Sequence, residues 1–149
     1  MSDFPGSVLF ACNRNTIRSP MAEVLMKHLL GHRIYVDSAG VRLSAAESDP
    51  FAVAALAEIG LDLSRHKPKT FDDLADRSID LIVTFTPQAQ LRAVELTRTI
   101  SCEIEYWPMA DPTIVEGNRD TRLEAYRDLR DALFDRIKQR FPISDAALD

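Results

Sequence analysis

Cysteine and glycine are both scarce in this chain of 149 residues, which has two of the first and five of the second. Two cysteines, Cys12 and Cys102, are too few for a disulfide scaffold, so we expect a protein whose thiols stay reduced. Long apolar runs are missing too, which argues against a membrane-spanning helix. The start, residues 1–6, lacks the basic and apolar regions of a signal peptide. We therefore expect a cytoplasmic protein without a membrane partner.

An excess of basic charge is also absent. Lys and Arg number 18 against 23 Asp and Glu, which gives a net charge of −5. Binding along a nucleic-acid backbone needs clustered Lys and Arg, so we expect no nucleic-acid partner. The chain does contain an ordinary globular mixture, with 46% apolar and 28% charged residues. Its length is typical of one domain, and we expect residues 1–149 to form a single domain.

Short apolar runs alternate with helical patterns along the chain. Strands are predicted at residues 7–11, 34–36, 81–85 and 104–107. Helices are predicted at 20–31, 50–60, 87–96 and 121–140, with a short one over 71–75. This alternation predicts an α/β fold, a three-layer sandwich in which helices cover both faces of a central four-stranded parallel sheet.

The segment CNRNTIRSP, residues 12–20, follows the first predicted strand and contains no glycine. Ligands of open α/β sheets bind beyond the carboxyl ends of the strands, where a loop enters a helix. The backbone N–H groups expected to converge on a phosphate there are those of Asn13, Arg14, Asn15, Thr16, Ile17 and Arg18. The positive end of the helix favours the thiolate of Cys12, which is a nucleophile for phosphorus. Arg18 can pair two phosphate oxygens, and Ser19 can donate a hydrogen bond to the sulfur.

Cys12 and Asp111 each also have an interpretation without catalysis. A lone cysteine is usually a small buried hydrophobe, and Asp111-Pro112 is a common turn sequence. Asp111 nevertheless lies in a loop from which it can protonate a leaving oxygen and then activate water. His28 and His32 are expected to be solvated. We find no His or Cys spacing suited to a metal and no nucleotide-binding loop, so neither a metal nor a cofactor is expected.

Residues 12–23, CNRNTIRSPMAE, resemble the signature of the low-molecular-weight protein tyrosine phosphatases, Cys-x-Gly-Asn-x-Cys-Arg-Ser-Pro-x-Ala-Glu. The similarity continues through DSAG at 37–40, through Leu63-Ser64 with His66, and to Asp111-Pro112, so it covers essentially the whole chain. The resemblance implies that Cys12 forms a phosphocysteine intermediate. It also implies that Arg18 binds the transferring phosphoryl group and that Asp111 is the general acid.

The resemblance further implies a supporting network that holds the loop in shape. Its members are expected to be Asn15, Ser19, Ser38 and His66. The histidine of this network orients the asparagine and does not transfer protons.

Three positions depart from the family pattern. Arg14 replaces the loop glycine, and we expect Asn15 to take the left-handed conformation because asparagine tolerates it. Ile17 replaces a second loop cysteine, so the reversible disulfide protection of the family is expected to be missing. Thr113 and Ile114 stand where aromatic residues commonly flank a phosphotyrosine ring, which leaves the substrate open.

The expected function is that of a cysteine-dependent phosphatase that hydrolyses phosphomonoesters, with protein phosphotyrosine foremost. Its partners would be a phosphorylated protein or a small aryl phosphate, and inorganic phosphate or sulfate should fit the loop. One alternative is an arsenate reductase of the same fold that uses an external thiol. An internal resolving cysteine is not expected, because Ile17 replaces one candidate and Cys102 lies near the start of a predicted strand. A second is a non-catalytic phosphate-binding regulatory module, against which the joint presence of Cys12, Arg18 and Asp111 argues.

Overall fold

The computed structural model describes residues 4–74 and 78–143. Four strands form one parallel sheet in the order β2-β1-β3-β4. Their bounds are Ser7–Cys12 for β1, Tyr35–Gly40 for β2, Leu81–Thr84 for β3 and Glu103–Tyr106 for β4. Every residue of the two central strands is buried, which explains why their sequences are apolar runs and not alternating patterns.

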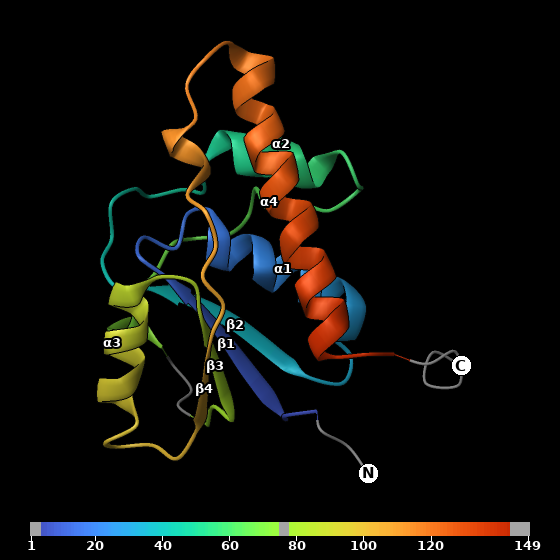
Figure 1. The fold of residues 1–149 in the computed structure, drawn as a ribbon. Coiled ribbons are helices and arrows are strands. Elements are labelled where there is room, and N and C mark those ends of the chain that lie inside the picture. The colour runs from blue at the N-terminus through green and yellow to red at the C-terminus, as the bar shows by residue number, and fades with distance from the viewer. Residues whose placement is uncertain (1–3, 75–77, 144–149) are drawn as a thin grey trace.

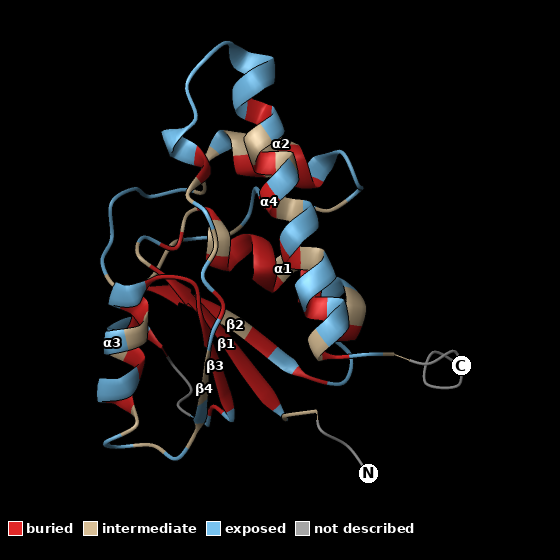
Figure 2. Ribbon diagram, in the orientation of Figure 1, coloured by how far each residue is buried: buried red, intermediate tan, exposed pale blue. Residues whose placement is uncertain are grey.

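Helices cover both faces of this sheet (Figure 1). Their bounds are Arg18–Leu30 for α1, Pro50–Ala57 for α2, Pro87–Leu96 for α3 and Arg119–Arg140 for α4. The larger core lies on the side of α1 and α4, with α2 packed against α4, and a smaller core lies under α3. Figure 2 shows the central strands β1 and β3 buried between the two layers, whereas the edge strand β4 is only partly covered. The predicted three-layer α/β fold is confirmed.

Several element ends differ from the prediction for local reasons. The helix α4 begins two residues early because the Asn118 side chain caps it by accepting a hydrogen bond from the Thr121 N–H at 2.8 Å. The helix α2 ends at Ala57, before Gly60, whose φ of +80° is incompatible with a helix. The predicted short helix is a 3-10 turn, η1 (Phe71–Asp73), and its expected end at residue 75 lies outside the described residues.

The strand order places residues 13–17 at the switch point of the sheet. The chain goes from β1 to β2 on one side, while β3 and β4 lie on the other side of β1. Such a reversal opens a crevice at the carboxyl ends of the two central strands, where open α/β sheets bind ligands. Within the described part of the chain, no helix is long and apolar enough to cross a membrane.

Candidate active site

Five residues, 13–17, connect the end of β1 to the start of α1. Asn15 has a φ of 58°, and no other non-glycine residue among those described has a positive φ. Arg14 therefore adopts an ordinary backbone conformation although it stands at the family's glycine position. The prediction that Asn15 takes the left-handed position is confirmed. Successive N–H groups around such a residue form a concave nest for anions.

The loop rests against the end of β2 at Gly40. A Cβ on Gly40 would lie 2.9 Å from both the carbonyl carbon of Arg14 and the nitrogen of Asn15, so only glycine leaves room for this approach. The next N–H, of Val41, donates to the Cys12 and Asn13 carbonyls at 3.1 and 2.9 Å. The loop is thus fastened to the sheet by its backbone.

A threonine that the sequence reasoning did not identify holds the other side of the loop. Thr86, just after β3, donates its hydroxyl hydrogen to Asn13 Oδ1 at 2.7 Å and caps α3 through the Ala89 N–H. The sequence feature that could have identified Thr86 is its place at the carboxyl end of a parallel strand, where polar residues gather around ligand sites.

The side chain of Asn15 points away from the loop and uses all its hydrogen-bonding capacity. Its Nδ2 donates to Ser19 Oγ at 2.8 Å and to Ser38 Oγ at 3.0 Å. Its Oδ1 accepts from the Lys69 N–H at 3.0 Å and lies 2.9 Å from His66 Nε2. Asn15 is fully buried, so these four bonds fix both the side chain and the loop backbone.

These bonds also determine which way the serine hydroxyls point. Ser19 Oγ accepts from Asn15, so its own hydrogen is free to point at Cys12 Sγ, 2.9 Å away. Ser38 Oγ likewise accepts from Asn15 and donates to Glu23 Oε1 at 2.5 Å. A hydrogen bond donated to the sulfur stabilises its thiolate form.

Glu23 is a member of this network to which the sequence reasoning gave no role. It is a buried carboxylate on α1 that pairs with Lys27 Nζ at 2.5 Å in addition to accepting from Ser38. The sequence feature that could have identified Glu23 is its position one helical turn after Ser19, on the buried face of the helix.

His66 lies against the network with a fixed tautomer. Both atoms near Nε2 are acceptors, Asn15 O at 3.2 Å and Asn15 Oδ1 at 2.9 Å, so Nε2 carries the hydrogen. Burial lowers the pKa of His66 below its ordinary value, against the opposing charge of Glu23. His66 is therefore neutral at neutral pH, in keeping with the orienting role expected of it. His28 and His32 are exposed, as predicted.

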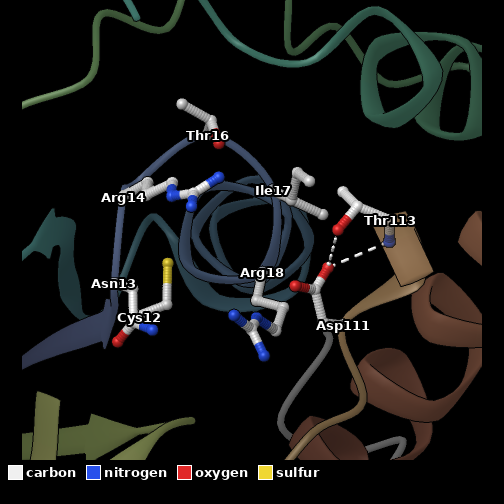
Figure 3. Close-up of a pocket in the computed structure, with 8 residues that line it drawn as sticks. All are labelled: Cys12, Asn13, Arg14, Thr16, Ile17, Arg18, Asp111 and Thr113. Atoms are coloured by element: carbon white, nitrogen blue, oxygen red, sulfur yellow. Dashed lines mark hydrogen bonds between the residues drawn. The ribbon is translucent and has the colours of Figure 1, made fainter. Parts of the chain in front are cut away.

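The loop surrounds a small open pocket (Figure 3). Its lining residues are Cys12, Asn13, Arg14, Thr16, Ile17, Arg18, Asp111 and Thr113. Arg18, the first residue of α1, donates from Nη1 to the Met109 carbonyl oxygen at 3.1 Å, which leaves its other N–H groups for a ligand. No side chain caps the start of α1, so the positive end of this helix is open to the loop.

Asp111 approaches this pocket from the segment after β4. It caps the 3-10 turn η2 (Pro112–Ile114) because its Oδ1 accepts from the N–H and the hydroxyl of Thr113, at 2.9 and 2.7 Å. In Figure 3 its second oxygen points toward the loop. The described residues include no set of three His, Cys, Asp or Glu side chains arranged to hold a metal ion.

The charge of Asp111 follows from opposing effects on its pKa. Burial raises the pKa of this carboxyl, but the two hydrogen bonds from Thr113 lower it. The nearby charges of Arg18 and Arg14 lower it further. The net pKa lies below the ordinary value, so Asp111 is ionised at neutral pH while the pocket holds no anion.

The second cysteine is far from this pocket. Cys102 precedes Glu103, which aligns through Leu81 with Val8 near the start of β1. Cys12 is therefore about 16 Å further along the strand direction and two strand spacings of about 4.8 Å across the sheet. Disulfides need Cα atoms about 4.4–6.8 Å apart, so the two cysteines cannot pair in this fold.

Comparison with known proteins shows the family to which the chain belongs. Residues 7–141 match the family model of the low-molecular-weight phosphotyrosine protein phosphatases. The chain belongs to this family. It is 34% identical over 131 residues to an arsenate reductase of Halalkalibacterium halodurans, which covers 88% of this chain and 91% of that protein.

Solved structures of low-molecular-weight phosphatase folds superpose on most of the chain. A Cys-to-Ser mutant of the YwlE arginine phosphatase, with its active-site serine phosphorylated, has a TM-score of 0.73 and 28% identity, covering 89% of this chain and 91% of that one. An arsenate reductase in a phosphate-binding state has a TM-score of 0.68 and 25% identity, covering 89% and 94%. This arsenate reductase, which shares the fold, therefore binds phosphate.

Proposed function

We propose that the protein is a cysteine-dependent phosphatase that hydrolyses phosphomonoesters through a phosphocysteine intermediate. The Cys12 thiolate attacks phosphorus, an S–P bond forms and the P–O bond to the leaving group breaks. Arg18 and the loop N–H groups bind the non-bridging oxygens, whose charge they neutralise in the transition state. Water then attacks the phosphocysteine, which releases inorganic phosphate and restores the thiolate.

Asp111 moves the proton in both steps. A bound phosphomonoester brings negative charge next to this carboxylate, which raises the fraction of Asp111 that is protonated. The protonated form gives its hydrogen to the leaving oxygen, and the resulting carboxylate takes a proton from the attacking water. One carboxylate on one side of the pocket is enough for the cycle.

The observation that carries this proposal is that hydrolysis needs nothing beyond the pocket itself. Cys12, Arg18 and Asp111 line one cavity, and water completes the reaction. Release of arsenite from a thiol adduct needs a second thiol, which Ile17 and the remote Cys102 do not provide. A free thiol nucleophile also works best where thiols stay reduced, which favours a cytoplasmic location.

Arsenate reduction by an external thiol is the second candidate. The 34% identity to an arsenate reductase favours it, and the thiolate that attacks phosphate also attacks the similar arsenate ion. A chain that merely binds phosphate is the third candidate, and Cys12 and Asp111 would then have no chemical role.

A parallel assay of four substrates distinguishes these functions. The substrates are p-nitrophenyl phosphate, a phosphotyrosine peptide, a phosphoarginine peptide, and arsenate with an excess of external thiol. Phosphoarginine is included because Thr113 and Ile114 offer no aromatic wall, and because a relative is an arginine phosphatase. We expect turnover of the phosphate compounds to exceed that of arsenate.

Two cysteine variants serve as the matched pair. Cys12→Ser should lower turnover by at least about 10³-fold, as loss of a nucleophile does, while it still binds phosphate. Cys102→Ser should leave turnover unchanged, because Cys102 lies at the far end of the sheet. Arsenate reduction without phosphate hydrolysis would establish the second function. Phosphate binding with no turnover of any substrate would establish the third.

A further inference from the structure

Arg14 lines the phosphate pocket, and its side chain has no hydrogen-bond or ion-pair partner among the described residues. It lies two residues after Cys12, so its Cα is within about 7 Å of the Cα of the nucleophile. The side chain is exposed and lines the pocket. Among the described residues no carboxylate pairs with it, whereas Arg18 is held by the Met109 carbonyl. A guanidinium so placed is available to a ligand.

Arg14 lies across the mouth of the pocket from Asp111. In Figure 3 Arg14 and Asp111 stand on opposite sides of the mouth, with Cys12 on the side of Arg14 and Arg18 between the two sides. A substrate that reaches Cys12 must leave the pocket between these two walls. The chain that carries the phosphate therefore passes next to the Arg14 guanidinium.

The rest of the rim offers little else for recognition. Apart from Arg14, the ionic side chains among the pocket's described lining residues are Arg18, which is assigned to the transferring phosphate, and Asp111. None of the described residues that line the pocket is aromatic, so they do not recognise a substrate by stacking. The charge of Arg14 also contributes to the low pKa of Asp111, which indicates that both groups act within one small volume.

We propose that Arg14 determines specificity by binding a second anion of the substrate, the carboxylate of an Asp or Glu next to the phosphorylated residue. This inference rests on the proposed phosphatase function and names its substrate class, an acidic phosphopeptide. Arginine suits the role because its planar fork pairs with a carboxylate through two parallel hydrogen bonds. The glycine that the family places here has no such group.

The test compares two phosphotyrosine peptides that differ only in having Asp or Asn on either side of the phosphotyrosine. For the unaltered protein we expect kcat/KM for the Asp peptide to be about fivefold higher, the upper range for an exposed ion pair. The ratio should fall to about one in Arg14→Gln and invert in Arg14→Glu. The preference should appear mainly in KM and shrink as salt is added. Because the readout is a ratio within each variant, a general loss of activity does not affect it.

Arg42→Gln is the matched control. Arg42 is exposed, and its backbone N–H binds the Asn13 carbonyl at 3.0 Å, but its side chain does not line the pocket. The fivefold ratio should persist in this variant. Equal ratios for the two peptides in the unaltered protein, an unchanged ratio in Arg14→Gln, or an equal loss in Arg42→Gln would each overturn the inference.

Binding to Cys12→Ser, measured by calorimetry, separates this inference from the proposed function. The Asp peptide should bind about fivefold more tightly than the Asn peptide to the variant that cannot turn over. Tighter binding of the Asp peptide, together with no hydrolysis by the unaltered protein, would refute the proposed function and support the role of Arg14. Hydrolysis by the unaltered protein, together with equal affinities for the two peptides, would support the proposed function and refute the role of Arg14.

Discussion

A methyl group at Gly40 should disturb the phosphate loop more than any surface change. In Gly40→Ala the new Cβ meets backbone atoms of Arg14 and Asn15 at 2.9 Å. Carbon atoms pack at about 3.5 Å or more, so the two backbones must separate by about 0.6 Å. Backbone on both sides cannot turn away as a flexible side chain would. The loop that carries the nucleophile is the less buried partner, and it is the one that moves.

The size of the effect follows from this displacement. Overpacking a well-packed region costs about 1–3 kcal/mol of unfolding free energy. A misplacement near 1 Å lowers catalysis about 100-fold, so a shift of about 0.6 Å should lower kcat/KM for p-nitrophenyl phosphate about 10- to 100-fold. The affinity for inorganic phosphate, measured by calorimetry, should fall in parallel because the same N–H groups move.

Gly60→Ala is the control for glycine replacement as such. Gly60 has a φ of +80°, and no atom of the described residues lies within 4 Å of where its Cβ would stand, so this change strains the backbone without touching a neighbour. It should cost about 1 kcal/mol of stability in urea unfolding and leave kcat/KM unchanged. Normal kinetics and normal stability in Gly40→Ala would refute the reasoning that the loop rests on this glycine.

Three further changes test other parts of the site and fold. Asp111→Asn should lower kcat/KM, which reports the steps up to departure of the leaving group, about 10²- to 10⁴-fold for phenyl phosphate and much less for p-nitrophenyl phosphate, since a good leaving group needs little protonation. An equal fall in kcat/KM for the two substrates would count against the acid role. Asn15→Gly keeps the left-handed conformation but loses the side-chain bonds, whereas Asn15→Ala loses both, so urea unfolding should show the alanine variant about 1 kcal/mol less stable; equal stabilities would mean that the φ of 58° carries no strain. The hydrogen bonds from Arg127, then the one from Arg130 and the charges of both arginines, lower the pKa of Glu58 from 4.5 to about 2. Its contribution to stability is therefore complete above about pH 4.5 and lost as the pH falls toward 2. The difference in Tm between the unaltered protein and Glu58→Gln should shrink over that window, and a constant difference would speak against the pairing.

The sequence predicts the parts of this molecule that depend on local pattern. Apolar runs indicated β1 and β3 because both strands are buried on both faces, and the spacing of Cys12 and Arg18 placed them at the two ends of one loop. The backbone conformation of Asn15 was also predictable, because few residues other than glycine tolerate a positive φ.

What escaped prediction depends on which strands become neighbours. Thr86 reaches Asn13 across 73 positions of sequence, and Ser38 reaches Glu23 only because β2 pairs with β1 beside α1. Gly40 has no sequence signal for its close contact, since the contact is with another segment's backbone. The roles of Cys12, Arg18 and Asp111 stay predictions until they are measured.

The central claim is that phosphate is transferred to Cys12 Sγ during turnover, and trapping the intermediate tests it most directly. Asp111→Asn should still be loaded by p-nitrophenyl phosphate, because the nitrophenolate leaves without an acid, but should release phosphate slowly for want of a base. Acid quenching followed by peptide mass spectrometry should then find phosphate on Cys12, with none on this peptide in the Cys12→Ala, Asp111→Asn double variant, which has no side-chain nucleophile at position 12. Phosphate on another residue, or hydrolysis that persists in Cys12→Ser, would contradict the account.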